Sequence, residues 1–460
     1  MILGLLLATT TVQPVTLVYA GDRLGKVEPC GCPKTPMGHI ARQVAYLDQK
    51  RAENPNIITF DLGNYFFESL AVEKVLREQH ARRAAILSRS LHKLKFDFMV
   101  PGPTDFAAGF AGYKKLVKDT KIPVLAADLK TPSGEPAFAS HQLFTRHEKR
   151  ILVIGIAGFV PADTQLKREA PLDTIRRVRA AVGPVDITIV ASHLDRSAGL
   201  GIAENEPDLA AVLIADKHLH LIPKHAGGAV VVGSSKEGKH VAELQLNHRG
   251  LGAYAGGMTM RRLEFKRRKA TGVEAEAIQS ELDQLKAGNT FSYRIDALGE
   301  ERSEDKEVAT WVKAYVHFVG KLELERGEAP PGYNGEGDFA GVDACATCHP
   351  TIVDTWRATR HAIAYQSLYS RGQHLDRECI GCHTAGWRHS GGFSDPRAVG
   401  ILKNVQCESC HGPGKEHAKP GDKRLIDRGK ANAEFCQSCH QKELETGFKE
   451  ETHIPLIKHW

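Results

Sequence analysis

The sequence of 460 residues is poor in aromatic side chains, which make up 7% of it, and it has only 4 Trp and 5 Met. Beyond the first twenty residues it lacks any uncharged apolar run near the roughly 18 residues that a transmembrane helix needs. It also lacks a concentrated basic face, because 61 Lys and Arg stand against 55 Asp and Glu and the net charge of +6 is spread along the chain. We therefore expect no internal membrane span and no nucleic-acid partner.

Cysteine is absent between Cys32 and Cys345, so the 10 cysteines form a pair near the N-terminus and a group of eight from Cys345 to Cys439. At roughly 100–200 residues per domain, the length predicts two to four domains. A Pro- and Gly-rich stretch, Gly327–Asp338, precedes the second group and is typical of a linker. The cysteines thus divide the chain into a front part and a C-terminal block.

The N-terminal segment Met1–Ala20 contains no charged side chain, and Thr9–Thr11, Gln13 and Pro14 interrupt its apolar run. It lacks the Lys or Arg that usually opens a secretory signal peptide. We interpret residues 1–14 as the remnant of an export signal. The alternative is that these residues form a buried first strand. Membrane association is expected only through this N-terminus.

Residues 15–265 alternate short apolar runs with amphipathic stretches such as His39–Ala52, Ala71–Leu94 and Ala111–Lys118. Strands that alternate with helices predict a layered α/β domain. Two apolar runs, Ala229–Gly233 and Val241–Leu246, are expected to close the domain as a hairpin that turns at Ser234–Gly238. The other expected strands are Val15–Ala20, Ile57–Leu62, Phe96–Val100, Ile122–Ala127, Ile151–Ile156, Ile187–Ala191 and Ala211–Ala215.

Residues 266–337 are polar and periodic, and they are predicted to form a helical linker. Its two helices are expected over Val273–Leu285 and Glu304–Leu324, with Ser303 as the N-cap of the second. The last domain is expected to cover residues 338–460.

The C-terminal block repeats the pattern Cys-x-x-Cys-His four times. Two thiols three residues apart can form thioethers with the two vinyl groups of one haem, and the adjacent imidazole then lies beneath the iron as its proximal ligand. We therefore expect four c-type haems. Their attachment residues are Cys345 and Cys348, Cys379 and Cys382, Cys407 and Cys410, and Cys436 and Cys439, and the proximal ligands are His349, His383, His411 and His440.

Two other chemistries use paired cysteines. Zinc sites take four thiolates but do not need a His directly after the second Cys of each pair. A disulfide framework does not demand the same spacing in every pair. The block is also too small and polar to build an ordinary core, which haems would fill. Because covalent haem is attached outside the cytoplasm, we expect a periplasmic or otherwise extracytoplasmic protein.

The sixth ligand of each iron separates electron relay from catalysis, because a second His closes the iron whereas an open position admits substrate. Besides the proximal ligands, the block contains six histidines, a number above the expected background. They are His361, His374, His389, His417, His453 and His459.

The block resembles the multihaem cytochromes that include tetrahaem cytochrome c554. The resembling segments are CATCHPTIVDTWRATRHAIAYQSL, RECIGCHTAGWRHSGGF, VQCESCHGPGKEH, FCQSCH and the terminal IKHW. In that family the His of the RHA segment and the His after CHGPG commonly act as distal ligands, which implies His361 and His417 here. The terminal Ile-Lys-His pattern implies His459 as a third. The resemblance implies electron transfer, in some relatives coupled to nitrogen-oxide chemistry.

Several segments of the front part resemble the metallophosphoesterase domain of periplasmic 5′-nucleotidases, namely GDRLGKVEPCGC, FDLGN, VPGPTDF, VASHLD and DKHLHLIP. Such enzymes hold two metal ions about 3.5–4 Å apart. Four residues match the metal ligands of that family: Asp22, His193, His218 and His220.

Three other positions depart from the pattern of that family. Leu24 stands where a His ligand belongs, Asn64 where the bridging Asp belongs, and Pro103 and Thr104 where an Asn-His pair belongs. A neutral amide bridges two cations poorly, because it brings no charge to offset theirs. We therefore expect no divalent metal and no phosphoesterase activity. A single-metal remnant at the matching residues and an active metal-dependent phosphoesterase are the alternatives.

Cys30 and Cys32 flank one Gly after the first expected strand, in the loop where this fold keeps its active site. Two such thiols could form a strained, labile disulfide, and they are our candidate redox pair. A static disulfide and a bound soft metal are the alternatives. The sequence resembles a divergent 5′-nucleotidase-like group that has this Pro-Cys-Gly-Cys motif.

Together these features predict an exported protein with two parts, a metallophosphoesterase-like α/β layered sandwich and a small, mainly helical and irregular multihaem cytochrome c domain. Its expected function is electron transfer with redox partner proteins rather than hydrolysis. A haem-based reductase or oxidase of small nitrogen compounds, with one open haem, is the alternative function.

Overall fold

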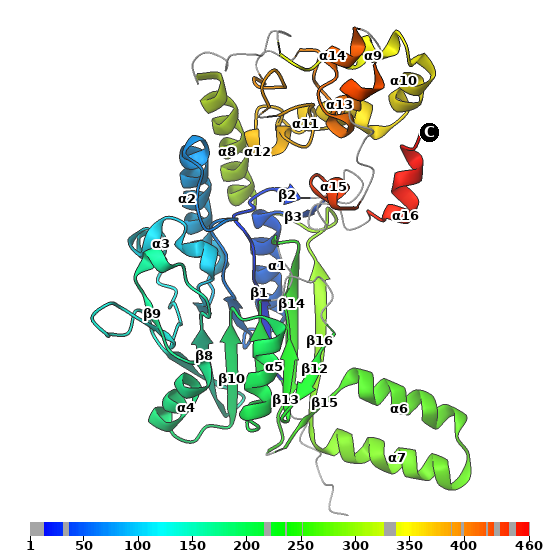
Figure 1. Cartoon of the computed structure of the whole chain (residues 1–460). Coiled ribbons are helices and arrows are strands. Elements are labelled where there is room, and N and C mark those ends of the chain that lie inside the picture. Colours follow the sequence, from blue (N-terminus) through cyan, green and yellow to red (C-terminus); the bar gives the residue numbers. More distant parts are fainter. Residues whose placement is uncertain are drawn as a thin grey trace, which may run out of the picture. The chain divides into compact units, whose positions relative to one another are not determined.

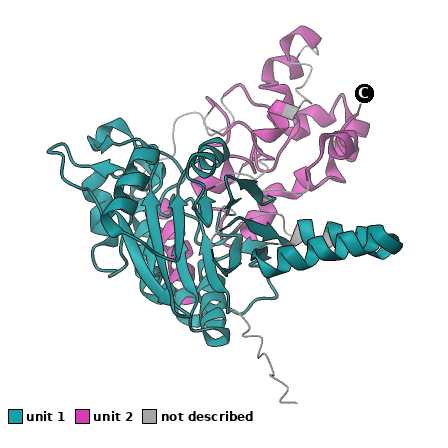
Figure 2. Cartoon of the chain, turned by 90° about the horizontal axis from the view of Figure 1, so that it is seen from below, with its two compact units in different colours: residues 1–30, 36–309 teal, residues 31–35, 310–460 magenta. Residues whose placement is uncertain are grey.

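The computed structural model describes residues 13–30, 36–215, 222–234, 237–250, 252–325, 337–387, 389–396, 400–419, 422–426, 433–440 and 448–459. The chain divides into two compact units, one made of Met1–Cys30 and Pro36–Ala309 and one that contains Thr310–Trp460. Figure 2 colours the two units separately. Among the described residues there is no helix with the length and apolar character that crossing a bilayer requires.

Two six-stranded sheets form the centre of the first unit (Figure 1). The first has the strand order β15-β16-β14-β1-β4-β5 and consists of β1 (Val15–Ala20), β4 (Ile58–Asp61), β5 (Phe98–Met99), β14 (His240–Asn247), β15 (Tyr254–Gly256) and β16 (Asn289–Ala297). The second has the order β12-β13-β11-β10-β8-β7 and consists of β7 (His141–Arg146), β8 (Lys149–Ile156), β10 (Ile187–Ser192), β11 (Ala211–Ile214), β12 (Lys224–Ala226) and β13 (Ala229–Val232). Two short pairs complete the strands, β2 (Pro29–Cys30) with β3 (Met37–Gly38) and β6 (Leu129–Lys130) with β9 (Lys167–Arg168).

Part of each sheet consists of parallel strands, whose carboxyl ends lie at the same edge of that sheet. β1 is parallel to β4 and β4 to β5 in the first sheet, and β10 is parallel to β8 and β11 in the second. Ligands of α/β sheets commonly bind beyond the carboxyl ends of parallel strands. The polar residues that follow these strands are therefore the natural candidates for a site.

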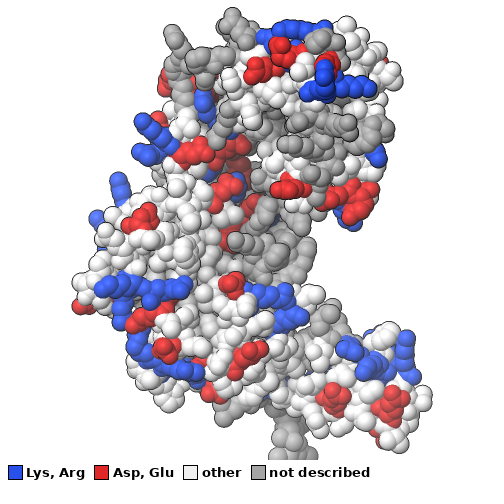
Figure 3. All heavy atoms as spheres, viewed as in Figure 1, with Lys and Arg blue, Asp and Glu red and all other residues white. Residues whose placement is uncertain are grey.

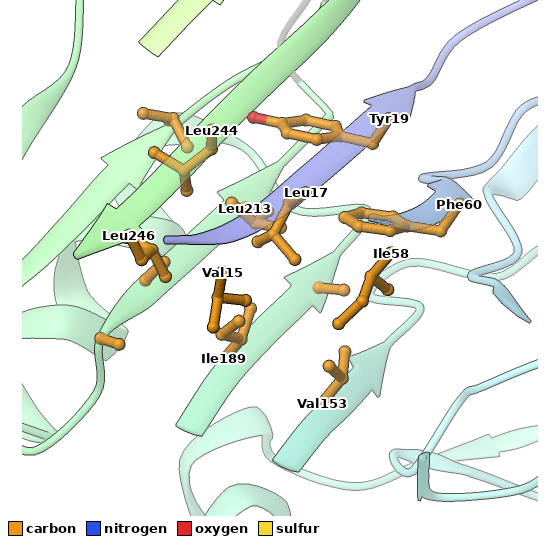
Figure 4. Close-up of a cluster of buried hydrophobic side chains, with 14 of the residues drawn as sticks. Val15, Leu17, Tyr19, Ile58, Phe60, Val153, Ile189, Leu213, Leu244 and Leu246 are labelled. Atoms are coloured by element: carbon orange, nitrogen blue, oxygen red, sulfur yellow. The ribbon is translucent and has the colours of Figure 1, made fainter. Parts of the chain in front are cut away.

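The two sheets face each other across one apolar core, part of which is drawn in Figure 4. Val15, Leu17 and Tyr19 occupy alternate positions of β1 and so share one face of the sheet. They meet side chains of the second sheet, among them Ile189 and Leu213, and all five are at most 1% exposed. This packing explains why β1 spans the residues that the sequence predicts.

Helices cover the outer faces of the sheets. The helices of the first unit are α1 (Ile40–Glu53), α2 (Arg77–Leu94), α3 (Gly109–Val117), α4 (Pro171–Val182), α5 (Arg196–Asn205), α6 (Gly257–Lys269) and α7 (Gly272–Ala287). Ile175 of α4 and Ile202 of α5 pack against the second sheet. Arg51 of α1 donates to Thr59 of β4 at 3.0 Å on the first sheet. The expected layered α/β sandwich is confirmed.

Several local predictions for the first unit were wrong. The strands β13 and β14 do not form a hairpin: β13 pairs with β11 in the second sheet, and β14 pairs with β1 in the first. Residues 122–127, expected as a strand, make only isolated bridges through Val124 and Leu125. An apolar run of this kind indicates that the segment is buried. It does not indicate which neighbouring strand the segment pairs with.

The stretch predicted as a helical linker, residues 266–337, contains the two expected helices, which are α7 and the helix that starts at Lys306. Between them it also contains β16, which is bonded to β14 over eight residue pairs, so the first unit extends to Ala309. The next helix, α8 (Lys306–Glu325), is capped by Asp305 rather than Ser303, because the Asp305 carboxylate accepts the Val308 N–H at 2.9 Å.

The second unit is a set of short helices joined by loops. They are α9 (Val342–Ala346), α10 (Pro350–Arg357), α11 (Ala364–Tyr369), α12 (Arg377–Ile380), α13 (Cys407–His411), α14 (Lys415–Ala418), α15 (Ala433–Gln437) and α16 (Glu450–His453). A small core around Phe393 and Ile380 holds the middle of this unit. The Nε–H group of Arg377 donates to both oxygens of the buried Glu323 carboxylate, at 2.8 and 2.7 Å. This interaction ties α12 to α8. The expected mainly helical and irregular domain is confirmed.

Charged side chains of both signs are interspersed on each unit. On the face seen in Figure 3, Lys and Arg alternate with Asp and Glu over the first unit and over the second. The described residues on that face therefore offer no extended surface of one charge.

Candidate functional site

Each Cys-x-x-Cys-His motif of the second unit forms a helical turn. In the first motif the His349 N–H donates to the Cys345 carbonyl at 2.9 Å, and in the fourth the His440 N–H donates to the Cys436 carbonyl at 2.7 Å. The third motif is helix α13 itself. Because residues three and four apart share one face of a helix, each turn brings the two thiols and the imidazole of a motif to the same side.

Three of the four motif histidines lie opposite a second imidazole that comes from elsewhere in the unit. Each of the histidines expected as distal ligands takes part in one such pair. The pairs, with the distances between ring centroids, are His349 and His417 at 6.3 Å, His361 and His440 at 5.9 Å, and His411 and His459 at 5.9 Å.

These spacings fit axial coordination of a haem iron. With metal–nitrogen bonds of about 2.0–2.1 Å and about 1.1 Å from nitrogen to ring centre, two imidazoles across one metal have centroids about 6.3 Å apart. His417 also donates from Nδ1 to the Asp422 carbonyl at 2.9 Å, which leaves Nε2 for a metal. Metal-binding histidines are commonly oriented by such a carbonyl.

The motif histidine of the second motif, His383, has different surroundings. It donates from Nδ1 to the Ala364 carbonyl at 2.7 Å, and Ser367 lies beside it. Burial lowers the pKa of His383, which favours the neutral imidazole that a metal binds. Within the described part of the chain no second imidazole ring pairs with it.

The other three histidines of the block lie beside aromatic rings. His374 is 4.2 Å from the ring of Tyr369, His389 is 6.3 Å from Phe339, and His453 is 5.2 Å from Phe448, measured between centroids. The Phe448 ring also stacks on His440 at 4.6 Å.

The thiols of different motifs lie close together. Cys345 of the first motif lies near Cys407 of the third, and Cys382 of the second lies near Cys439 of the fourth. None of the eight motif cysteines, all of which are described, takes part in a disulfide. In the described residues no group of three or more His, Cys, Asp or Glu is arranged to hold a metal ion.

In the first unit, polar residues collect where parallel strands end. Asp22 follows β1, Asn64 follows β4, Thr104 follows β5, and His193 follows β10. The Asn64 amide links them: Nδ2 lies 2.7 Å from Oδ1 of Asp22 and 3.0 Å from Nε2 of His193. The nearest approach of His193 to Asp22 itself is 3.8 Å.

The hydrogen bonds around Asn64 saturate its amide. The Nδ1 of His193 lies 2.7 Å from the Leu62 carbonyl, and since a carbonyl only accepts, Nε2 of His193 accepts from Asn64. The Asn64 Oδ1 accepts from the Thr104 N–H at 2.9 Å, and the Thr104 hydroxyl lies 2.9 Å from it. Gly102 leaves room for this amide, because a Cβ there would lie 2.5 Å from Asn64 Oδ1.

The backbone around this cluster is in an unusual conformation. Asp22, Leu24 and Asn64 have φ of 48°, 55° and 51°, in the left-handed region that costs non-glycine residues energy. Such strain is typical of functional positions. The strained backbone therefore makes this edge of the sheet a candidate site.

Some of the other residues predicted for this site lie outside the residues that the structure describes. His218 and His220 lie outside the described residues, and so does Cys32. Cys30 is in β2, where its backbone pairs with Met37 of β3. Of the expected metal-site remnant, the structure thus brings together Asp22 and His193.

Two buried carboxylic acids lie beneath the cluster. Burial raises the pKa of Asp61 to about 7 and that of Asp105 to about 6. Asp105 accepts three backbone N–H groups, from Tyr65, Phe66 and Gly102, whereas the buried Oδ2 of Asp61 has no hydrogen-bond partner.

The first unit is expected to lose stability as pH rises from about 4 to 7, because the folded state keeps a proton on Asp61 that the unfolded chain releases near its usual pKa. The slope amounts to at most about 1.4 kcal/mol per pH unit for one proton. Asp61→Asn should flatten this slope, and the exposed Asp163→Asn should not. Denaturant unfolding of each variant across this pH range measures the effect; an unchanged slope in Asp61→Asn contradicts it.

These features define a phosphoesterase-type α/β sandwich in the same chain as a unit of the c-type cytochrome pattern. Residues 344–412 match the family model described as cytochrome c554 and c-prime. Cytochrome c-554 of Nitrosomonas europaea is 30% identical over an alignment that covers 22% of this chain and 57% of that protein. The chain thus spans just over half the length of this curated relative. The second unit carries a cytochrome c554-type segment, and that family binds c-type haem covalently.

Solved structures show the fold of the sandwich. A candidate 5′-nucleotidase of Staphylococcus aureus, solved with α-ketoglutarate, has a TM-score of 0.51 and 13% identity and covers 85% of this chain and 71% of its own. The sulfate thiohydrolase SoxB of Thermus thermophilus, solved with glycerol, has a TM-score of 0.50 and 14% identity and covers 67% and 61%. At these identities the likeness concerns the fold alone, that of the 5′-nucleotidase type of phosphoesterase.

Some residues of these sites were missed in the sequence. Thr104 was noted only as a replacement, and nothing in its type indicated that it would donate to Asn64. Gln406 and Glu408 are buried beside the third motif, at 4% and 3% exposure. The sequence does not indicate whether a charged residue in a variable position of a motif is buried.

Proposed function

We propose that this protein is an extracytoplasmic electron-transfer protein with four covalently bound c-type haems. The observation that carries the proposal is the set of three imidazole pairs, each of which joins a motif histidine to His417, His361 or His459. Bound haem supplies reversible one-electron chemistry. Each pair of histidines would hold one haem iron and would exclude small ligands from it.

The arrangement of the thiols supports passage of electrons within the unit. The first and third motifs lie together through Cys345 and Cys407, and the second and fourth through Cys382 and Cys439. Groups attached to neighbouring motifs are therefore held close to each other by the chain. Redox partner proteins would supply and remove the electrons.

A second candidate function follows from His383. Because no imidazole pairs with it in the described residues, a haem held by His383 would have room for a substrate at its iron. A reductase or oxidase of small nitrogen compounds would use this position, with Ala364 and Ser367 orienting the His383 ring.

The sandwich is proposed to be inactive as a phosphoesterase. Asn64 joins Asp22 and His193 through hydrogen bonds where a bridging carboxylate would hold metal ions. The Cys30–Cys32 loop is proposed as a redox or binding loop on the basis of its spacing and of its place after β1.

The test is the haem content and the spin state of the full chain produced in a host that matures c-type cytochromes. We expect four haems per chain by pyridine haemochrome and mass spectrometry, and three low-spin signals in the electron paramagnetic resonance spectrum. One further signal that becomes low-spin when cyanide or NO is added would favour the second candidate function. Fewer than four haems, or several high-spin irons, would contradict the proposal.

A further inference from the structure

The strongest feature that electron transfer by itself leaves unexplained is a carboxylate inside the third motif. Glu408 occupies the first variable position between Cys407 and Cys410 and is 3% exposed. Acidic side chains are rarely buried to this extent without partners that compensate the charge. Its partners therefore indicate what it does.

In the described part of the chain the Glu408 carboxylate accepts hydrogen bonds from backbone N–H groups. Its Oε1 accepts from Ala340 and from Gly414, both at 2.8 Å, and its Oε2 accepts from Gly341 at 2.8 Å. Both oxygens thus act as acceptors, as in an ionised carboxylate. Hydrogen bonds of this kind to a charged acceptor are stronger than those between neutral groups.

These bonds join parts of the chain that are far apart in sequence. Ala340 and Gly341 lie five and four residues before Cys345 of the first motif, while Gly414 lies three residues after His411 of the third. The neighbouring Gln406 adds a parallel link, because its Oε1 accepts the Val342 N–H at 2.7 Å and its amide donates to Lys403 at 2.7 Å. Glu408 and Gln406 together hold the start of α9 against α13.

The same carboxylate lies close to an attachment residue of each motif. Glu408 directly follows Cys407 in the chain. Gly341, whose N–H donates to Glu408, has its carbonyl oxygen 3.6 Å from the Sγ of Cys345. The carboxylate therefore lies between the first and the third motif.

We propose that Glu408 positions the first and third haem-attachment motifs and, as a buried negative charge between them, lowers the reduction potentials of the two haems attached there. The proposal rests on the proposed function. The oxidised iron carries one more positive charge than the reduced iron, so a nearby anion stabilises the oxidised form. In a buried place this interaction is screened much less than at the surface.

The experiment is a spectroelectrochemical redox titration of the full, haem-loaded chain with Glu408→Gln, which keeps the shape of the side chain and removes its charge. Two of the midpoint potentials should become more positive while the others stay where they are. The control is Glu434→Gln, an exposed carboxylate two residues before Cys436, which should move no potential appreciably. Gln406→Ala loosens the same junction without a change of charge, so it should lower the melting temperature and leave the potentials nearly unchanged.

Two results would overturn the proposal. One is a fully loaded Glu408→Gln protein with unchanged potentials; the other is a Gln406→Ala protein that shows the same shifts, since loosened packing would then be the cause. If Glu408→Gln does not mature, Ser409→Asp replaces it, because it adds a charge to the same motif and should move the same two potentials down; no shift there also overturns the proposal. Haem content is counted for each variant, so a failure of the four-haem function is recognised separately.

Discussion

Replacing His417 by Ala is expected to convert one low-spin haem into a high-spin haem that binds cyanide or NO. In the structure His417 lies opposite His349 of the first motif, with 6.3 Å between ring centroids, and the Asp422 carbonyl orients it. Removal of this ring takes away the sixth ligand while both thioethers and the proximal ligand stay. The covalent attachment should therefore keep the haem count at the level of the unmodified protein.

This change of spin state should be large enough to detect directly by spectroscopy. One iron in the chain should change spin state completely, with a high-spin signal in the electron paramagnetic resonance spectrum and a new spectral shift when ligand is added. His389→Ala is the matched control, because His389 is an exposed histidine of the same block that lies beside Phe339 instead of a motif imidazole. A high-spin signal in the control, or none in His417→Ala, would show that the pairing is wrong.

The cytochrome motifs could be read from the sequence because their chemistry is local. The Cys-x-x-Cys-His spacing places two thiols and one imidazole on a single helical turn, so no distant contact is needed to recognise it. The distal histidines are different: His417 meets a ring 68 residues away in the chain by their numbers, which only the fold can arrange. The resemblance to cytochrome c554 supplied the candidates, and the structure adds which motif histidine each one faces.

The fold class of the sandwich could be predicted from the sequence, but the pairing of its strands could not. Inner strands such as β1 are apolar apart from Thr16 because they are buried on both faces, and this pattern is visible in the sequence. For the same reason the sequence did not show that Ala229–Val232 and His240–Asn247 belong to different sheets. Two buried strands with a short connection look like a hairpin whether or not they pair. The capping role of Asp305 in place of Ser303 depends on where the helix begins, which is the least certain feature of any sequence pattern.

Asn64, in the cluster after β1, β4 and β10, also shows how far the sequence allows prediction. The sequence indicated that Asn64 cannot serve as a bridging carboxylate. It could not indicate that the amide would form hydrogen bonds to both Asp22 and His193, because that depends on side-chain placement across three strands.

Asn64→Asp is expected to destabilise the first unit strongly in the absence of metal and to make it bind a divalent cation. The new carboxylate would lie where Nδ2 now lies, 2.7 Å from the Asp22 carboxylate, and two donated hydrogen bonds would become one repulsive contact. Loss of hydrogen bonds in a buried place, together with an unpaired charge, should cost about 2–5 kcal/mol of unfolding free energy. Denaturant unfolding with a chelator present measures this loss.

Added Mn²⁺ or Zn²⁺ should reverse much of that loss, because two carboxylates and the His193 imidazole form a donor set that suits such ions. At 100 times the dissociation constant, a ligand that binds only the folded state restores about 2.7 kcal/mol. Asn64→Ala separates the two effects, since it also removes the amide but supplies no ligand, and it should be destabilised without responding to metal. If the unmodified protein gains as much stability from metal as Asn64→Asp does, then the amide does not stand in for a metal and the inactive-phosphoesterase interpretation fails. If only Asn64→Asp responds, the edge of the sheet retains the shape of a metal centre, and one side chain determines whether it holds a metal ion or a closed hydrogen-bond network.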